Sequence, residues 1–382
     1  MAYGKKTKKG VNMEKNFYFK TDKLSVGYNN KAIITDIDIN IKKGEIFTLI
    51  GPNGSGKSTI LKTITKQLSK IAGLIYIENL SLENITNKEM AKKLAVVLTE
   101  RIKPEMMSCE EVVATGRYPY TNHFGLLTKK DREIVRDSLD RVHALDIADK
   151  DFTAISDGQR QRIMLARAIC QQPEIIVLDE PTSFLDIRHK IELLNILRKM
   201  AKEENITVIM SLHEIDLASK ISDRVMCVKG DKISAIGTPE EIFVGERINE
   251  LYDIKNGYYN MAFGSVELSK PEGEPQIFVI AGAGKGIPIY RKLQKKGIPF
   301  STGIIYDNDV DYQIAKVLAQ GIYFQKAFNP IGEDIYIKAL GAVKNSKYVI
   351  DAGSEIGEFN RFNRELVNFA KENNKLISLD KI

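Results

Sequence analysis

The feature that most constrains this chain is a glycine-rich segment at residues 51–59, which fits the pattern G-x-x-x-x-G-K-[ST]. A strand-like run at 46–50 precedes it and a helix-like run at 59–64 follows it, which is the context that the motif requires. Glycines let backbone N–H groups close around phosphate oxygens, and the following helix directs its positive N-terminus there. We therefore predict a nucleoside triphosphate site that contains Gly51, Asn53, Gly54, Gly56, Lys57, Ser58 and Thr59.

Two residues of this segment have defined chemical tasks in such a site. Lys57 would reach the β- and γ-phosphates, and the hydroxyl of Ser58 would bind Mg²⁺. The apolar run 175–178 reads as a buried parallel strand and leads into Asp179 and Glu180. Ligands of open α/β sheets collect at that end of the strands. We expect Asp179 to hold Mg²⁺ through water and Glu180 to polarise the attacking water.

Residues 154–162 lie between these motifs and read Ala-Ile-Ser-Asp-Gly-Gln-Arg-Gln-Arg, ahead of a helical pattern. With both nucleotide motifs present in this order, the chain resembles the ATP-binding subunits of ABC transporters, whose signature is Leu-Ser-Gly-Gly-Gln. Ser156, Gly158 and Gln159 match that signature. The resemblance implies that these three residues bind the γ-phosphate of an ATP held by a second copy of the chain. Two copies would face head to tail with two ATPs between them.

The signature departs from the family where Ile155 and Asp157 replace the Leu and the first Gly. The extra negative charge of Asp157 near a phosphate must point away or be neutralised, and Arg160 is the candidate partner. Taken alone, the segment would also suit an ordinary capped helix.

Three further residues take their roles from the same resemblance. Tyr28 stands where the family stacks an aromatic ring on adenine, although an aromatic near a strand start is more often part of a core. Asp186, at the end of the segment 183–186, matches the loop that crosses the dimer interface. His213 ends another strand-like run and matches the switch histidine that contacts the γ-phosphate.

One position departs from the family in a way that concerns the metal. The family usually has a Gln after the strand-like run 94–98, where it touches Mg²⁺ and couples to the permease. Here Thr99 stands at that position, followed by Glu100. Thr99 could still offer an oxygen to Mg²⁺, and Glu100 could replace the amide. We therefore count Thr99 with Ser58 and Asp179 as a candidate Mg²⁺ ligand.

The segment 109–125 indicates which group of ABC transporter ATPases the chain resembles. The residues that indicate it are the core Gly116-Arg117-Tyr-Pro119 and the Phe-Gly that follows. It looks like the helical-subdomain segment of ATPases that drive import of iron–siderophores, haem or cobalamin, and the resemblance covers about residues 17–268. A surface loop with packed tyrosines is the plainer interpretation of this segment.

The resemblance implies an ATP-hydrolysing subunit that uses ATP and Mg²⁺ and works at the cytoplasmic face of the cell membrane. Its partners would be a second copy of itself, membrane-spanning permease subunits and, indirectly, a substrate-binding protein. The alternative is a soluble ABC-type ATPase that acts in iron–sulfur assembly or on nucleic acid. An enzymatic C-terminal domain driven by the ATPase is less favoured, because no nucleophile–base pair stands out there.

Charge, cysteine spacing and the length of apolar runs argue against a nucleic-acid-binding, a disulfide-rich or zinc-binding, and a membrane-spanning protein. The 56 Lys and Arg against 50 Asp and Glu give a net charge of +6 without a focused basic patch, so no nucleic acid partner is expected. Cys109, Cys170 and Cys227 lie far apart with no Cys-x-x-Cys pair, which argues against a disulfide framework and a zinc site. No uncharged apolar run reaches the roughly 18 residues that span a bilayer.

The sequence predicts two α/β domains and two connecting or terminal segments. Residues 1–16 form a disordered extension, in which Met13 is our expected natural start. Residues 17–268 form a P-loop ABC ATPase domain, with a mixed sheet and a helical subdomain at about 100–172. A Pro/Gly/Glu-rich linker at 269–275 leads to a smaller, doubly wound parallel α/β domain of Rossmann-like type at 276–382.

In the C-terminal domain, strand-like and helix-like segments alternate about five times. Predicted strands fall at 276–280, 299–306, 321–328, 348–351 and 375–379. The turn with Gly282, Gly284 and Gly286 differs from the dinucleotide fingerprint, because its third glycine comes one residue early. It is either a tightly packed turn or a small-ligand site shared with residues 353–357, and in the second case the domain would sense a cytosolic ligand.

Overall fold

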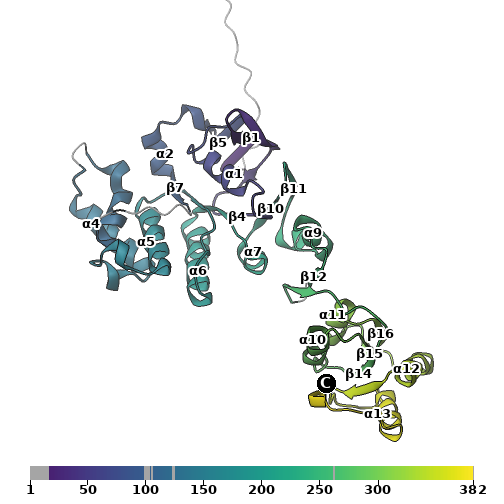
Figure 1. The fold of residues 1–382 in the computed structure, drawn as a ribbon. Coiled ribbons are helices and arrows are strands. Elements are labelled where there is room, and N and C mark those ends of the chain that lie inside the picture. Colours follow the sequence, from purple (N-terminus) through teal and green to yellow (C-terminus); the bar gives the residue numbers. More distant parts are fainter. Residues whose placement is uncertain (1–16, 99–103, 105, 123–124, 261–262, 382) are drawn as a thin grey trace, which may run out of the picture. The chain divides into compact units, whose positions relative to one another are not determined.

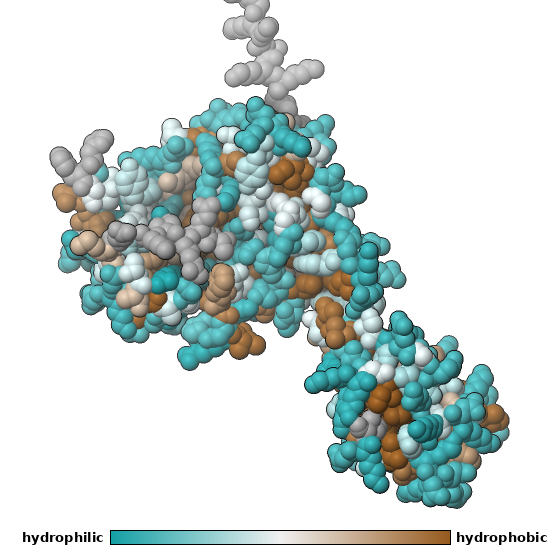
Figure 2. Space-filling view, in the orientation of Figure 1, coloured by the Kyte–Doolittle hydropathy of each residue, from teal (hydrophilic) through white to brown (hydrophobic). Residues whose placement is uncertain are grey.

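The computed structural model describes residues 17–98, 104, 106–122, 125–260 and 263–381. The predictions on 1–16 with Met13, and on Thr99 and Glu100, lie outside these residues. The chain divides into two compact units, Met1–Phe243 and Val244–Ile382, each described below by itself (Figure 1). In the described part of the chain, every helix is too short or too polar to cross a membrane. Most of the visible surface is hydrophilic (Figure 2).

The first unit is built around a mostly parallel sheet with the strand order β11-β10-β4-β9-β8-β7. Only β11 runs antiparallel to its neighbour, β10. The inner strands are continuous apolar runs because both faces of the sheet are covered. The strand bounds are β4 Ile46–Ile50, β7 Leu94–Val97, β8 Ile175–Leu178, β9 Thr207–Ser211, β10 Arg224–Lys229 and β11 Lys232–Gly237.

A second, antiparallel sheet of the same unit packs over helix α1 (Lys57–Ile64) and shares one apolar core with the parallel sheet. Its strands are β1 Phe19–Tyr28, β2 Lys31–Ile37, β3 Asn40–Ile41, β5 Ala72–Ile77 and β6 Leu80–Ser81. The mixed sheet structure agrees with the predicted fold class. Further helices of this unit are α2 Asn87–Lys93, α6 Ile187–Glu204, α7 Ile215–Ile221 and α8 Pro239–Ile242.

A helical subdomain is formed by α3 (Cys109–Ala114), α4 (Lys129–Arg141) and α5 (Asp157–Cys170), with α3 and α4 packed on α5. Each of the three helices begins with a capping box, in which the side chain before the helix and the third helical residue satisfy each other's free backbone N–H groups. These caps explain why short polar sequences start helices at these places.

The second unit holds a four-stranded, all-parallel sheet with the order β16-β15-β14-β17. Successive residues of β14 face opposite sides: Ile277 and Val279 lie in the core with α10 and α11, and Phe278 and Ile280 in the core with α12 and α13. The sheet is therefore doubly wound, as predicted. The bounds are β14 Ile277–Ile280, α10 Ile287–Lys295, β15 Phe300–Tyr306, α11 Val310–Leu318, β16 Gly321–Gln325, α12 Glu333–Asn345, β17 Tyr348–Asp351 and α13 Phe362–Glu372.

The strand predicted at 375–379 was wrong. This segment pairs with the sheet only through an isolated parallel bridge between Val349 and Leu376, and the chain then enters a 3-10 turn at Leu379–Lys381. An apolar segment of this length can satisfy its burial by covering a sheet edge, without forming a full ladder.

The compact units divide earlier than the predicted linker at 269–275. Helix α9 (Gly245–Leu251) and the hairpin of β12 (Gly257–Asn260) and β13 (Ser265–Leu268) group with the second unit. The physical reason is a set of long-range contacts: Asn260 donates a hydrogen bond to the backbone oxygen of Gln313 at 3.3 Å, and Arg291 forms an ion pair with Glu267.

Candidate functional site

The glycine-rich loop connects β4 to α1, as the motif predicts. Gly51 must be glycine because a Cβ there would lie 2.1 Å from the backbone oxygen of Val228. Gly56 caps α1 with φ +94°, in the left-handed region that favours glycine. Lys57 is buried and its Nζ donates to the carbonyl oxygens of Gly51 at 2.8 Å and Pro52 at 3.0 Å. The loop therefore holds the Lys57 side chain at the N-terminus of α1.

A pocket of about 410 Å³ opens in front of this loop. It brings together residues that were predicted from distant parts of the sequence, and its lining includes Tyr28, Asn53, Gly54, Gly56, Lys57, Ser58, Thr59, Glu180 and His213. Tyr28 is 46% exposed and its hydroxyl lies 3.3 Å from Oγ1 of Thr59. Because its ring lines the pocket and is not part of the core, Tyr28 is available to stack on a flat ligand.

At the carboxyl ends of β8 and β9, four polar side chains form a connected group. Ser211 Oγ donates to Oδ1 of Asp179 at 2.6 Å and accepts the backbone N–H of Glu180 at 2.9 Å. Oε1 of Glu180 lies 2.5 Å from Nε2 of His213. Glu180 has φ +50°, an uncommon conformation for a residue with a side chain. The contacts of this group therefore hold the Glu180 carboxylate in one direction.

Ser211 was missed in the sequence analysis. A signal for it exists, because β8 and β9 are parallel neighbours in which Leu178 pairs with Met210. The next residues, Asp179 and Ser211, must then lie side by side at the sheet edge. Predicting this needed the strand order, which the sequence pattern alone does not provide.

The charges of the site influence one another across the pocket. Burial lowers the pKa of Lys57, and the carboxylates of Glu180 and Asp179 oppose this by favouring the charged amine. A cation that two carboxylates influence across an open pocket suits an anionic ligand with an accompanying metal ion.

The residues present fit Mg²⁺. This ion prefers oxygen ligands and usually binds through one or two carboxylates together with substrate phosphates and water. Asp179 supplies a carboxylate at the end of β8, 5% exposed, and Ser58 supplies a hydroxyl at the start of α1. Within the described residues no cluster of three or more His, Cys, Asp or Glu side chains could hold a metal by itself.

The signature segment forms the N-terminus of α5. Ser156 caps the helix, accepts the N–H of Gln159 at 3.3 Å and donates its own N–H to Oε1 of Gln159 at 3.0 Å. Arg160 pairs with Asp157 at 2.9 Å, as expected for the extra negative charge. The lining of the pocket at Lys57 does not include Ser156, Gly158 or Gln159. Within one chain, the predicted triphosphate residues therefore fall into two separate groups.

Asp186 lies close to the signature helix. It caps α6, accepts the N–H of His189 at 3.0 Å, and its Oδ2 lies 2.9 Å from Nδ1 of His189. The hydrogen bond from the backbone N–H of His189 is the largest of the effects that lower the pKa of Asp186. A Cβ on Gly158 would lie 3.4 Å from Leu185, so the loop 183–186 runs beside the signature.

In the segment 109–125, Arg117 is buried inside the helical subdomain. Its Nε donates to Asp131 at 2.9 Å and its guanidinium also reaches the backbone oxygen of Cys170 at 2.9 Å. Tyr118, next to it, is 79% exposed. The conspicuous arginine therefore joins parts of the subdomain, and the neighbouring tyrosine lies at the surface.

The glycine turn of the second unit is largely filled by carboxylates. The N–H groups of Gly286 and Ile287 donate to Asp311 at 3.0 Å, and that of Ala283 donates to Asp309 at 2.7 Å. Asp311 is fully buried, and burial raises its pKa. A side chain on Gly286 would lie 2.6 Å from Tyr290. These contacts favour the tightly packed turn over an anion site at Gly282, Gly284 and Gly286.

Two family models match the chain. The model described as ABC transporter matches residues 34–183, and the model described as the MJ0874 family matches residues 300–382. The first match includes the glycine-rich loop, the signature and the carboxylates at the end of β8.

Similar proteins are named as ATP-binding proteins of transporters, and a solved structure of a transporter has a similar fold. The uncharacterized ABC transporter ATP-binding protein MJ0873 of Methanocaldococcus jannaschii is 46% identical over 277 residues, which cover 72% of this chain and 96% of that protein. The iron(3+)-hydroxamate import ATP-binding protein FhuC of Bacillus subtilis is 35% identical over 234 residues, which cover 61% of this chain and 87% of that protein. A solved structure of a putative metal-chelate type ABC transporter, in an inward-facing conformation, aligns with a TM-score of 0.55 and 26% identity over 62% of this chain and 89% of its own.

Proposed function

This chain belongs to the family of ABC transporter ATP-binding proteins, and from that premise we propose that it is the ATP-hydrolysing subunit of a metal-chelate importer. The observation that carries the proposal is the pocket in which the glycine-rich loop faces Glu180 and His213. The metal-chelate class is supported by a relative named for iron(3+)-hydroxamate import and by the fold of a transporter named for metal chelates.

In this proposal, the main residues of the site have separate tasks. Tyr28 stacks on the adenine, and Lys57 and the loop N–H groups bind the β- and γ-phosphates. Ser58 and Asp179, with Thr99 as a further candidate, would hold Mg²⁺, which when bound neutralises charge on those phosphates. Glu180 polarises a water molecule whose oxygen bonds to the γ-phosphorus as the bond to ADP breaks, and the carboxylate takes up the proton.

His213 acts on this step through Glu180, since the two side chains are in contact at 2.5 Å. It also lines the pocket, so it can reach the γ-phosphate of bound ATP. The hydrogen bonds of Ser211 orient the Asp179 carboxylate and hold the backbone of Glu180.

A second copy of the chain completes the site in this proposal. The capped N-terminus of α5, with Ser156, Gly158 and Gln159, offers N–H groups to the γ-phosphate of the other copy's ATP, and Asp186 lies at the interface between the copies. ATP then stabilises the closed dimer and ADP does not, so each hydrolysis cycle opens and closes it. The helical subdomain passes the motion to permease subunits at the cytoplasmic face of the membrane, and a substrate-binding protein delivers the chelate to them.

Replacing Glu180 with Gln tests the catalytic assignment. We expect ATP hydrolysis to fall by about 100-fold or more, because the variant cannot accept the proton. We also expect ATP-bound dimers to accumulate, measured by size-exclusion chromatography with light scattering. Glu203→Gln, an exposed position on α6, is the matched control and should keep the normal rate. A Glu180→Gln chain that hydrolyses ATP at the normal rate would contradict the assignment.

Co-purification from native membranes tests the transport function separately. We expect the chain to be recovered with a polytopic membrane protein, in the detergent extract of the membrane fraction. Recovery of the active ATPase in a complex of water-soluble proteins only would favour the alternative in iron–sulfur assembly or on nucleic acid.

A further inference from the structure

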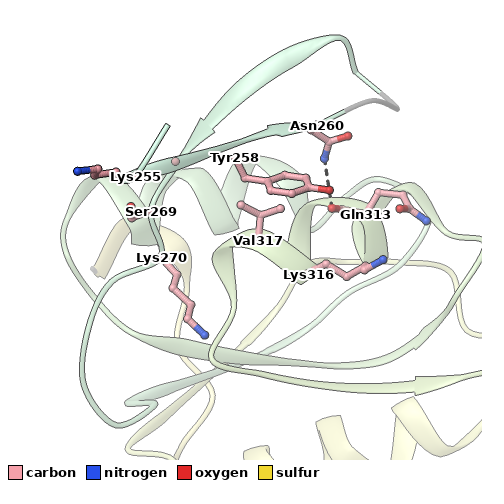
Figure 3. Close-up of a pocket in the computed structure, with 9 residues that line it drawn as sticks. Lys255, Tyr258, Asn260, Ser269, Lys270, Gln313, Lys316 and Val317 are labelled. Atoms are coloured by element: carbon pink, nitrogen blue, oxygen red, sulfur yellow. Dashed lines mark hydrogen bonds between the residues drawn. The ribbon is translucent and has the colours of Figure 1, made fainter. Parts of the chain in front are cut away.

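The second unit contains a pocket that has no part in the ATPase site. Its volume is about 580 Å³, within the range of small-molecule sites in proteins. It lies between the β12–β13 hairpin, the segment that leaves the hairpin, and helix α11 (Figure 3). Its lining residues are Lys255, Gly257, Tyr258, Asn260, Ser269, Lys270, Gln313, Lys316 and Val317.

The lining carries three positive charges and no negative one. Lys255, Lys270 and Lys316 come from three separate segments, and all three are exposed. Figure 3 shows the three lysines at the edges of the lining, with Tyr258 and Val317 between them. A lining with one sign of charge raises the local concentration of anions.

An ion pair of the hairpin lies outside the pocket. Glu267 of β13 is buried and forms an ion pair with Arg291 of α10, and neither residue lines the pocket. The carboxylate of the hairpin is therefore used elsewhere. Within the described residues the three pocket lysines form no ion pair closer than 4.0 Å, and the ammonium group of Lys316 lies 5.6 Å from the ring centre of Tyr312.

The wall of the pocket is held in place by buried contacts. Asn260 is 4% exposed and its side-chain N–H donates to the backbone oxygen of Gln313 at 3.3 Å, which ties the hairpin to α11 (Figure 3). The side-chain amide of Gln313 donates to the backbone oxygen of Asp307 at 3.3 Å. The hairpin and α11 therefore form a fixed side of the pocket, while Lys255, Ser269 and Lys270 line it from the segments around the hairpin.

The remaining lining residues define the rest of the ligand. Tyr258 is 38% exposed, and its ring and Val317 give the pocket an apolar part. An aromatic ring beside positive charges recognises a flat ring attached to an anionic group. We propose that this pocket binds a small organic anion that carries a flat ring and more than one negative charge, of which a nucleotide is the model case.

This proposal does not depend on the transported compound or on hydrolysis. It also places the ligand of the second unit away from the glycine turn at 282–286, whose N–H groups already bind Asp309 and Asp311.

Calorimetric titration of the full chain that carries Lys57→Ala tests the proposal, because this variant removes the main phosphate contact of the ATPase site. The probes are ADP, AMP and citrate, the last a polyanion without a ring. We expect ADP and AMP to bind once per chain, with an affinity that falls as salt is added. Adding Lys270→Glu and Lys316→Glu should weaken this binding by at least about tenfold.

Two controls separate the parts of the proposal. Lys295→Glu, an exposed position of α10 outside the pocket, should leave nucleotide binding unchanged. Tyr258→Ala should weaken ADP and AMP binding and leave citrate unaffected. Failure of both nucleotides to bind the Lys57→Ala chain, or binding that survives the two Lys→Glu changes, would overturn the site. Citrate binding as tight as that of ADP would overturn the requirement for a ring.

Discussion

At the scale of single residues, Ser211 connects the carboxylate of Asp179 to the backbone of Glu180, and the proposed hydrolysis needs both residues. Its hydroxyl donates to Asp179 at 2.6 Å while it accepts the N–H of Glu180 at 2.9 Å. Ser211 does not line the pocket, so we assign it as a positioning residue. Its influence on the reaction must pass through the orientation of Asp179 and Glu180.

Ser211→Ala is expected to lower kcat roughly tenfold, which corresponds to about 1.4 kcal/mol of transition-state stabilisation. The affinity for ATP should stay within about twofold, because the phosphate contacts of the loop are intact. Steady-state ATPase kinetics and nucleotide titration measure the two quantities. Ser219→Ala, whose hydroxyl bonds only to Asp216 of its own helix, is the control. Ser211→Thr keeps the hydroxyl and should restore the rate; an equally slow Thr variant would point to packing.

The residues with a motif could be predicted from sequence, and those without one could not. Lys57, Glu180 and His213 each follow an apolar strand by a fixed number of residues in the sequence. The structure brings all three to one pocket. Ser211 and Lys316 gain their meaning only from neighbours that the fold brings together. A local pattern contains no information on such neighbours.

At the scale of elements, the helical subdomain depends on a buried ion pair. Arg117 and Asp131 have side chains only 5% and 8% exposed, and they join the segment after α3 to α4 at 2.9 Å. Hydrogen bonds from Thr128 are the largest effect that lowers the pKa of Asp131, and Arg117 adds to it. Removing the guanidinium would therefore leave a buried carboxylate without its counter-ion.

Arg117→Met is expected to lower the free energy of unfolding by about 3–5 kcal/mol, the usual effect of breaking a buried pair. Tyr118→Ala, at an exposed position, should change it by less than about 0.5 kcal/mol. Urea unfolding of the two variants measures this difference. If the segment were an interface built on its arginine, the difference in stability would disappear: Arg117→Met would be as stable as the wild type and would lose only permease-stimulated ATPase activity.

Elements with strong local patterns were predicted well, and elements that depend on distant contacts were not. The apolar runs of β4 and β8 fix these strands by themselves, since no helix suits so short a buried run between turns. The segment 375–379 has a similar pattern, but it lies at the outer edge of β17, whose other edge pairs with β14, and it forms only a bridge there. Whether such an apolar segment forms a full strand depends on the strand beside it, and the sequence of the segment does not determine that neighbour.

At the scale of the whole molecule, the chain consists of two units with separate hydrophobic cores. The core of the first unit contains residues from Tyr18 to Val228, and the two cores of the second contain residues from Ile277 to Ala370. The predicted linker at 269–275 has the composition of a domain boundary, but the contacts of Asn260 and Glu267 attach the preceding hairpin to the second unit. Composition predicted that a boundary exists, and packing decides where it lies.

Separate cores predict separate unfolding. Differential scanning calorimetry of the full chain should show two transitions, since each unit has apolar cores of its own. In the Glu180→Gln chain, which should retain ATP, a hundredfold excess of Mg·ATP over its Kd adds about 2.7 kcal/mol to the unit that binds it. That transition should rise by roughly 5 °C or more. A second Lys57→Ala change should abolish this rise, because the phosphate contact is lost.

Whether Mg·ATP also raises the transition temperature of the second unit, called here the second transition, depends on the pocket of that unit. If this pocket binds nucleotides, Mg·ATP also raises the second transition, and Lys270→Glu with Lys316→Glu removes only that rise. The two sets of substitutions should therefore act on different transitions of the same scan. One cooperative transition that shifts as a whole under either set would show that the units fold as one body, and the division at Phe243 and Val244 would then not be a boundary of stability.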